Sequence, residues 1–235
     1  MYIDIHSHVI PGIDDGAKDM ETSMQMLRIA AEQGTSHIIA TPHYFPGITQ
    51  YDVSTIVNHC SILNDLTAAA GMKIKILPGS EVFLTPDVPE RCVASEICTL
   101  NQSSHMLIEL PFTSYPLYMD DVLYKLQLEG ITPIIAHPER NANIFLHHTQ
   151  VDEYVNRGIL IQVNSGSITG LFGKTVQKAA MQLIQKGLVH FVASDAHTCG
   201  GRSPNLTKAA MIVEEHFGRS TADKLFYENA TRFIF

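Results

Sequence analysis

Residues 3–8 read IDIHSH, and residues 12–16, a little further on, read GIDDG. Apolar and polar side chains alternate through the first stretch, and this period of two predicts a β-strand. Because side chains two positions apart project from the same face of a strand, His6 and His8 are expected to lie side by side. Paired imidazoles are common transition-metal ligands, and the carboxylates of the Asp-Asp-Gly turn can bend back toward them. The stretch therefore predicts a metal site at the end of the first strand.

A second stretch, near the other end of the chain, has a similar design. Residues 188–193 form an apolar run, and Asp195 and His197 follow it two positions apart. A single His-x-His occurs at many polar strand ends, so the first stretch alone is a weak signal of metal binding. Two such stretches favour one site that the fold assembles from both ends of the chain.

The chain between these stretches alternates between short apolar runs and amphipathic segments. About seven β–α units without a linker predict an α/β fold whose parallel strands are buried on both faces. We expect a single domain, residues 1–235, that forms a distorted parallel (β/α)7 barrel, with an open doubly wound sheet as the alternative. The expected strands are 3–8, 37–43, 74–81, 105–111, 131–137, 159–167 and 189–195, and the expected helices are 19–34, 53–70, 118–130, 150–158, 174–187, 206–218 and 220–227.

The composition indicates a globular protein without a nucleic-acid or membrane partner. Hydrophobic residues make up 45% and charged residues 17% of the chain, which is typical of a folded domain. The net charge of −8 argues against a nucleic-acid-binding surface. We expect no secretory signal and no membrane insertion, because no apolar run reaches the roughly 20 residues of a membrane span. The four cysteines form no Cys-x-x-Cys pair, which fits a cytoplasmic location.

Residue types that commonly bind metals recur at the ends of the predicted strands. Taken singly, each has an ordinary explanation, such as a turn residue or a cap. Taken together, carboxylates and imidazoles that meet at the mouth of a barrel would be costly to bury without partners. Divalent cations remove that cost, and this donor set suits two or three ions of Mn, Fe or Zn better than Ca. The candidates are His6, His8, Asp14 or Asp15, His43, Glu81, Glu109, His137, Asp195 and His197.

Two arginines closely follow predicted ligands. Arg140 lies three residues after His137, and Arg202 lies five residues after His197. A guanidinium fork beside a site with several metal ions fits the oxygens of a phosphoryl group. The alternative for each arginine is a surface salt bridge.

Eight motifs stand in order along the chain, namely His-x-His at 6–8, Asp-Asp-Gly at 14–16, Thr-Pro-His at 41–43, Gly-x-Glu at 79–81, Leu-Ile-Glu at 107–109, Ala-His-Pro-Glu-Arg at 136–140, Gln-Val-Asn-Ser-Gly-Ser at 162–167 and Ala-Ser-Asp-Ala-His at 193–197. Together they resemble the polymerase and histidinol phosphatase (PHP) superfamily, and within it the bacterial capsule and exopolysaccharide tyrosine-protein phosphatases. The resemblance spans almost the whole chain. It implies a distorted (β/α)7 barrel of the PHP type with three metal ions, usually manganese, with Fe, Zn or Mg as alternatives.

The resemblance also implies roles for individual residues. Arg140 and Arg202 would hold the phosphate. Asp15 rather than Asp14 would be the ligand of the Asp-Asp-Gly motif, with Asp14 as the alternative. The implied metal ligands are His6, His8, Asp15, His43, Glu81, Glu109, His137, Asp195 and His197.

The leading hypothesis is a metal-dependent protein-tyrosine phosphatase in which a metal-bound hydroxide attacks the phosphorus. By the resemblance, its phosphotyrosine substrate is a bacterial tyrosine kinase that regulates capsular or exopolysaccharide synthesis. The alternatives are a small-molecule phosphatase such as a histidinol phosphatase, a phosphodiesterase of the same superfamily, and a non-catalytic metal-binding or kinase-docking protein. None of the four cysteines begins the Cys-x5-Arg loop of thiolate phosphatases, so we predict no phosphocysteine intermediate. The oligomeric state is left open.

Overall fold

The strands of the computed structural model pair in parallel and form two sheets. The structure describes residues 1–112, 114, 116–141 and 148–235. One sheet has three strands in the order β1-β2-β4, and the other has six in the order β3-β5-β6-β7-β8-β9. The predicted α/β class with parallel strands is thereby confirmed. The strands are β1 (Tyr2–Ser7), β2 (Thr35–Ala40), β3 (His43–Tyr44), β4 (Lys75–Pro78), β5 (Glu81–Phe83), β6 (His105–Glu109), β7 (Thr132–Ala136), β8 (Leu160–Asn164) and β9 (Phe191–Ala193).

Two of the predicted strands, 37–43 and 74–81, are each divided into two shorter strands. A Thr-Pro pair that ends at Pro42 separates β2 from β3, and a Gly-Ser pair that begins at Gly79 separates β4 from β5. Proline has no N–H to donate to a ladder. Its carbonyl oxygen still accepts the N–H of Glu81 at 3.1 Å. The breaks therefore move the second half of each predicted strand into the larger sheet.

The end of β1 is hydrogen-bonded to the segment that follows β9. The N–H of His8 donates to the carbonyl oxygen of Ala196 at 2.9 Å, and the N–H of Asp195 donates to that of His6, also at 2.9 Å. These backbone bonds place the two stretches that the sequence singled out next to each other, although more than 180 residues separate them.

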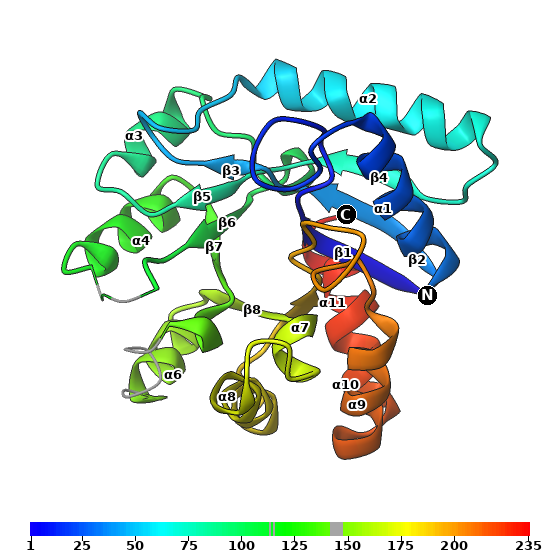
Figure 1. The fold of residues 1–235 in the computed structure, drawn as a ribbon. Coiled ribbons are helices and arrows are strands. Elements are labelled where there is room, and N and C mark those ends of the chain that lie inside the picture. Colours follow the sequence, from blue (N-terminus) through cyan, green and yellow to red (C-terminus); the bar gives the residue numbers. More distant parts are fainter. Residues whose placement is uncertain (113, 115, 142–147) are drawn as a thin grey trace.

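Most helices lie outside the strands of the two sheets, as Figure 1 shows. Their starts follow local signals, and Asp19 caps the first helix because its side chain accepts the N–H of Thr22 at 2.8 Å. The predicted helices are present, with ends that differ by one or a few residues. The helices are α1 (Met20–Glu32), α2 (Val53–Ala69), α3 (Val88–Val93), α4 (Met119–Leu128), α6 (His148–Asn156), α7 (Ser165–Ile168), α8 (Lys174–Gln185), α9 (Thr207–Phe217), α10 (Arg219–Asp223) and α11 (Asn229–Phe233).

Two expectations about element ends were wrong. The predicted strand 159–167 ends at Asn164, and its last residues begin the short helix α7. The cause is Glu139, whose buried carboxylate accepts the backbone N–H of Asn164 at 2.9 Å and the hydroxyl of Ser167 at 2.6 Å. The helix predicted at 220–227 extends beyond its expected end. α10 continues through a π-helical segment, Lys224–Glu228, into α11.

The two sheets share one apolar cluster. Ile3 and Ile39 come from the smaller sheet, and Leu107, Ile134 and Phe191 come from the larger one. Two further clusters lie among the strands and the helices that cover them. Within the described ranges, none of the helices combines the length and the hydrophobicity that a membrane span requires.

Gly79 is a position where the fold leaves no room for a side chain. A Cβ atom there would lie 2.8 Å from Ile39 Cγ2 and 3.0 Å from Leu100 Cδ2. We predict that Gly79→Ala lowers the free energy of unfolding by about 1–3 kcal/mol through overpacking. Urea denaturation of the metal-depleted protein measures this change. Gly201→Ala is the matched control, because a Cβ there meets no atom within 4 Å. Equal stability of the two variants would contradict the prediction.

Candidate metal centre

Glu81, at the start of β5, lies among buried imidazoles. Its Oε2 atom is 3.2 Å from His6 Nε2, 3.3 Å from His8 Nε2 and 3.1 Å from His43 Nδ1. Its Oε1 atom is 2.8 Å from Nε2 of His137, the residue that follows β7. Both histidines of the first strand are fully buried. Side chains at the carboxyl ends of several strands therefore converge on one carboxylate.

Asp195, two residues after β9, faces the same imidazoles. Its Oδ1 atom is 3.6 Å from Nε2 of His6 and also 3.6 Å from Nε2 of His8. Arg202 donates to Oδ1 at 2.7 Å, and Arg140 donates to Oδ2 at 3.0 Å. Both arginines are therefore paired with a buried carboxylate of the cluster, and the alternative of a surface salt bridge is not what the structure shows.

All nine predicted ligands lie in four overlapping groups whose potential ligand atoms are within 4.8 Å of one another. Several residues belong to two groups, so the arrangement suits neighbouring ions that share ligands. The role of these residues as ligands stays a prediction. The groups are His8, Asp15, His43 and His197; His6, His8 and Glu81; His6, His137 and Asp195; and His43, Glu81 and Glu109.

The two carboxylates of the Asp-Asp-Gly turn face different partners. Asp14 Oδ2 accepts a hydrogen bond from His8 Nδ1 at 2.7 Å, on the side of the ring that points away from Glu81, and another from the N–H of His43 at 3.1 Å. Asp15 Oδ1 instead lies 3.3 Å from His197 Nε2 and 3.4 Å from His43 Nε2. The geometry thus favours Asp15 as the ligand and gives Asp14 the task of orienting His8.

The hydrogen bonds of the outer ring nitrogens test whether the cluster fits a metal. Nδ1 of His6 donates to Gln162 Oε1 at 3.0 Å, as Nδ1 of His8 does to Asp14, and Nδ1 of His197 donates to the carbonyl oxygen of Asp195 at 3.0 Å. Each bond leaves Nε2 free to present a lone pair to the cluster, which is how metal-binding histidines are normally oriented.

The charges of the cluster point to the same conclusion. Nε2 of His6 and Nε2 of His8 are only 3.2 Å apart. Oε2 of Glu81 is buried but has no hydrogen bond of good geometry among the described residues. Lone pairs crowded in this way require a proton or a cation between them. The residues present therefore fit divalent metal ions.

The pKa values show how the cluster responds when protons, rather than metal ions, lie between its lone pairs. Burial opposes a charge on His8, but the carboxylates of Asp14 and Glu81 raise its pKa well above the usual value. Burial likewise opposes a charge on Glu81, but the surrounding imidazoles lower its pKa well below the usual value. Burial and the neighbouring charge of Glu81 raise the pKa of Glu109. Because a metal ion displaces protons from such groups, metal binding here should release protons.

Two of the predicted ligands have unusual backbone conformations. His137 has φ +32° and Asp195 has φ +51°, which is the left-handed region that residues other than glycine seldom adopt. Such strain costs of order 1–3 kcal/mol and persists where the surrounding structure enforces it. His137 follows β7 directly and Asp195 lies two residues after β9, and in each case the turn directs the side chain into the cluster.

Sequence reasoning quoted Gln162 and Asn164 as part of a motif but missed their role, which is to support the cluster from behind. Gln162 donates to Asn164 Oδ1 at 2.8 Å, and Asn164 donates to Asp195 Oδ2 at 2.6 Å. Both amides are fully buried in β8. Two uncharged polar residues at period two in an otherwise apolar strand were the available signal, because a buried amide needs a partner.

Arg140 lies between two aromatic rings. Its guanidinium carbon is 4.7 Å from the centroid of Phe112 and 4.4 Å from that of Phe172. Stacking of this kind holds a guanidinium plane and is worth about 0.5–2 kcal/mol per ring. Phe112 also stacks on His137, with ring centroids 5.7 Å apart. No local pattern in the sequence indicated this arrangement.

The fold and the site define a parallel α/β protein with a candidate metal centre and two arginines at the ends of its strands. A family model described as "Capsular polysaccharide synthesis, CpsB/CapC" matches residues 2–235. The chain belongs to this CpsB/CapC family, which confirms the resemblance that its motifs suggested.

Several proteins are similar to the chain over nearly its full length. Tyrosine-protein phosphatase YwqE of Bacillus subtilis is 36% identical over 228 residues, which cover 97% of this chain and 89% of the relative. Tyrosine-protein phosphatase CpsB of Streptococcus agalactiae serotype III is 34% identical over 233 residues, with coverage of 97% and 96%. A solved structure, from a study of YwqE of Bacillus subtilis and CpsB of Streptococcus pneumoniae as metal-dependent tyrosine phosphatases, matches with a TM-score of 0.90 and 36% identity. It covers 94% of this chain and 89% of the solved chain.

Removing a carboxylate from the cluster should release metal. We predict that Glu81→Ala and Asp195→Ala each lower the amount of manganese that the chain retains after dialysis, because each removes a negatively charged donor shared by several imidazoles. Metal analysis by mass spectrometry gives the readout, and at least a tenfold weaker affinity is expected. His216→Ala, on an exposed face of α9, is the control. Equal retention by all three variants would show that the ligand set is wrong.

Proposed function

We propose that this protein is a metal-dependent protein-tyrosine phosphatase, a phosphoric monoester hydrolase. The observation that carries the proposal is the pairing of Arg140 and Arg202 with a carboxylate of the candidate metal cluster. Both arginines also line the small pocket beside the cluster. The names of the relatives YwqE and CpsB support the substrate class, and the description of the similar solved structure supports metal dependence.

We propose that the nine clustered residues hold manganese, with three ions per chain, and that Fe, Zn or Mg are the alternatives. The mixture of imidazoles and carboxylates supports this choice of ions over calcium. Bound divalent cations would activate water as a nucleophile and neutralise the charge of a phosphoryl group. The role of the protein is to hold the donor atoms in position. Gln162 and Asp14 contribute to this by orienting His6 and His8.

We propose that the two arginines bind a phosphoryl group. Arg140 is held by its aromatic neighbours and by Asp195, so little side-chain entropy remains to be lost when a ligand binds. A phosphoryl group in the pocket would meet both guanidinium forks, whose planar geometry matches its oxygens. Phe112 lines the same pocket and is 41% exposed, so it offers an aromatic face to a tyrosyl ring.

The cysteines support a mechanism without a thiolate nucleophile. Burial raises the pKa of Cys60 and Cys98 to about 12, and it also raises the pKa of Cys92 and Cys199. A reactive cysteine needs the opposite shift. None of the four thiols is among the residues that line the pocket beside the cluster.

The remaining proposals concern architecture and context. We propose that the two sheets form one distorted (β/α)7 barrel of the PHP type in a single domain, residues 1–235. Support comes from the hydrogen bonds between β1 and the segment after β9 and from the shared apolar cluster.

We propose a bacterial tyrosine kinase that regulates capsular or exopolysaccharide synthesis as the phosphotyrosine substrate, in line with the family description. A cytoplasmic location is supported by four free thiols.

Chelation should remove both activity and stability. We predict that a metal-free preparation has no detectable activity on para-nitrophenyl phosphate and melts at a lower temperature, because bound metal stabilises the folded state by mass action. Adding manganese back should restore both properties. Full activity in a preparation shown by metal analysis to be metal-free would overturn the metal-dependent mechanism.

A second prediction separates the metal mechanism from a thiolate mechanism. We expect a variant with all four cysteines replaced by serine to keep its activity on a phosphotyrosine peptide in manganese. Arg140→Ala should lose roughly 100- to 1,000-fold in kcat/KM, the loss typical of one oriented charge-stabilising donor. Arg219→Ala is the control, because the side chain of Arg219 is 74% exposed and lies on α10.

The same assay tests the substrate class. Faster turnover of histidinol phosphate than of phosphotyrosine peptides by the unmodified protein would favour the small-molecule alternative. A cysteine-free variant that is folded and metal-loaded but inactive would refute the metal mechanism.

A further inference from the structure

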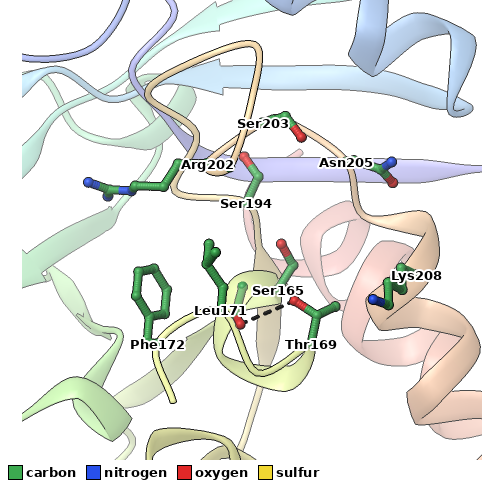
Figure 2. Close-up of a pocket in the computed structure, with 11 residues that line it drawn as sticks. Ser165, Thr169, Leu171, Phe172, Ser194, Arg202, Ser203, Asn205 and Lys208 are labelled. Carbon is green, nitrogen blue, oxygen red and sulfur yellow. Dashed lines mark hydrogen bonds between the residues drawn. The ribbon is translucent and has the colours of Figure 1, made fainter.

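A second pocket adjoins the metal centre on the side of Arg202, which lines both pockets. We call it the flanking pocket. Ser194, the neighbour of Asp195 in the chain, also forms part of its wall. Figure 2 shows the pocket between α7, with the turn that follows it, and the loop that leads to α9. Its lining includes Ser165, Thr169, Phe172, Ser203, Asn205 and Lys208.

One side of the flanking pocket carries polar groups that have no protein partner. Among the residues that the structure describes, the hydroxyls of Ser165 and Ser203 make no hydrogen bond, and the ammonium group of Lys208 makes no ion pair. Ser165 is only 4% exposed. In Figure 2 the nitrogen of Lys208 is turned toward Ser165 and Thr169. These groups are therefore available to a ligand that enters the pocket.

The charge of the flanking pocket differs from that of the molecule. The chain has a net charge of −8. The residues that line this pocket include two cations, Arg202 and Lys208, and no carboxylate. Arg202 is already paired with Asp195, whereas Lys208 has no carboxylate within 4 Å among the described residues. The negative charge of the whole molecule would repel an acidic side chain, whereas the flanking pocket would attract it. Any preference of the protein for an acidic side chain must therefore arise in this pocket.

The position of the pocket indicates where such a side chain comes from. A peptide whose phosphotyrosine occupies the metal centre must continue along the surface of the protein. Because Arg202 lines both pockets, residues next to the phosphotyrosine can reach the flanking pocket. Leu171 and Phe172 form an apolar wall there, against which the methylene groups of a side chain can pack.

We propose that the flanking pocket binds a residue next to the phosphotyrosine of the substrate and selects an acidic side chain through Lys208. The proposal rests on the proposed phosphatase function and adds a sequence preference to it. Ser165 and Ser203 supply hydrogen-bond donors to the same carboxylate.

The test uses a set of phosphotyrosine peptides that differ at one position. Each peptide has alanine at the three positions on either side of the phosphotyrosine, except that one of these positions carries glutamate or, in a matched peptide, glutamine. The readout is the ratio of kcat/KM for the glutamate and glutamine peptides, measured on the manganese-loaded protein. At one or two positions we expect a ratio of about three to five, the size typical of a partly exposed ion pair.

The variants assign the preference to one side chain. Lys208→Met should bring the ratio to about one, and Lys208→Glu should reverse it and favour a peptide with lysine at the same position. Lys178→Met is the matched control, because Lys178 is an exposed lysine of α8 outside the flanking pocket. It should keep the ratio of the unmodified protein. Because each ratio is internal to one variant, changes in overall activity cancel.

A binding measurement separates this proposal from the proposed function. Fluorescence anisotropy with peptides that carry a non-hydrolysable phosphonate analogue of phosphotyrosine requires no turnover. Glutamate peptides should bind about three to five times more tightly than glutamine peptides, and Lys208→Met should abolish the difference. A ratio of one at every position, or a preference that persists in Lys208→Met, overturns the proposal. Loss of turnover on all aryl phosphates with this binding preference intact would refute only the phosphatase function.

Discussion

The close approach of His6 Nε2 and His8 Nε2, 3.2 Å apart against the buried carboxylate of Glu81, is the constraint on which the rest of the structure depends. Two lone pairs at this distance repel each other unless a proton or a cation lies between them, and a buried carboxylate is costly without partners. The fold must therefore hold these groups together, and divalent ions bound as proposed would make this placement stable. If the cluster holds metal ions as proposed, folding and metal binding are coupled, because the donor set does not exist in the unfolded chain.

The scaffold meets this constraint with two kinds of contact. Backbone hydrogen bonds between the end of β1 and the segment 194–197 join the two ends of the chain at the cluster. Buried polar side chains then fix the orientation of several donors: Gln162 and Asp14 orient His6 and His8, and Asn164 orients Asp195. Misplacement of a donor by a fraction of an ångström weakens a metal site, so these supports contribute to function without touching substrate.

The sequence predicted the parallel α/β class and the set of clustered residues because both follow from local signals. Strand periodicity predicts which residues end a strand, and parallel strands bring their ends together. Periodicity could not predict the end of β8 at Asn164, because Glu139 sets that end from a distant part of the chain. The stacking of Arg140 between Phe112 and Phe172 depends equally on contacts between remote segments. Long-range side-chain contacts of this kind leave no periodic pattern.

The site divides its tasks between parts of the fold that differ in rigidity. The candidate ligands lie at the ends of buried strands, where close packing resists any change in position. The groups that would meet the rest of a substrate lie on α7, the turn after it, the loop before α9 and the first turn of α9, outside the strands that carry the candidate ligands. Arg202 belongs to both parts, since it is bonded to Asp195 and lines the flanking pocket. Substitutions in the flanking pocket at residues other than Arg202 can therefore change the substrate preference without altering the donor geometry. A substitution of Arg202 itself would disturb both tasks.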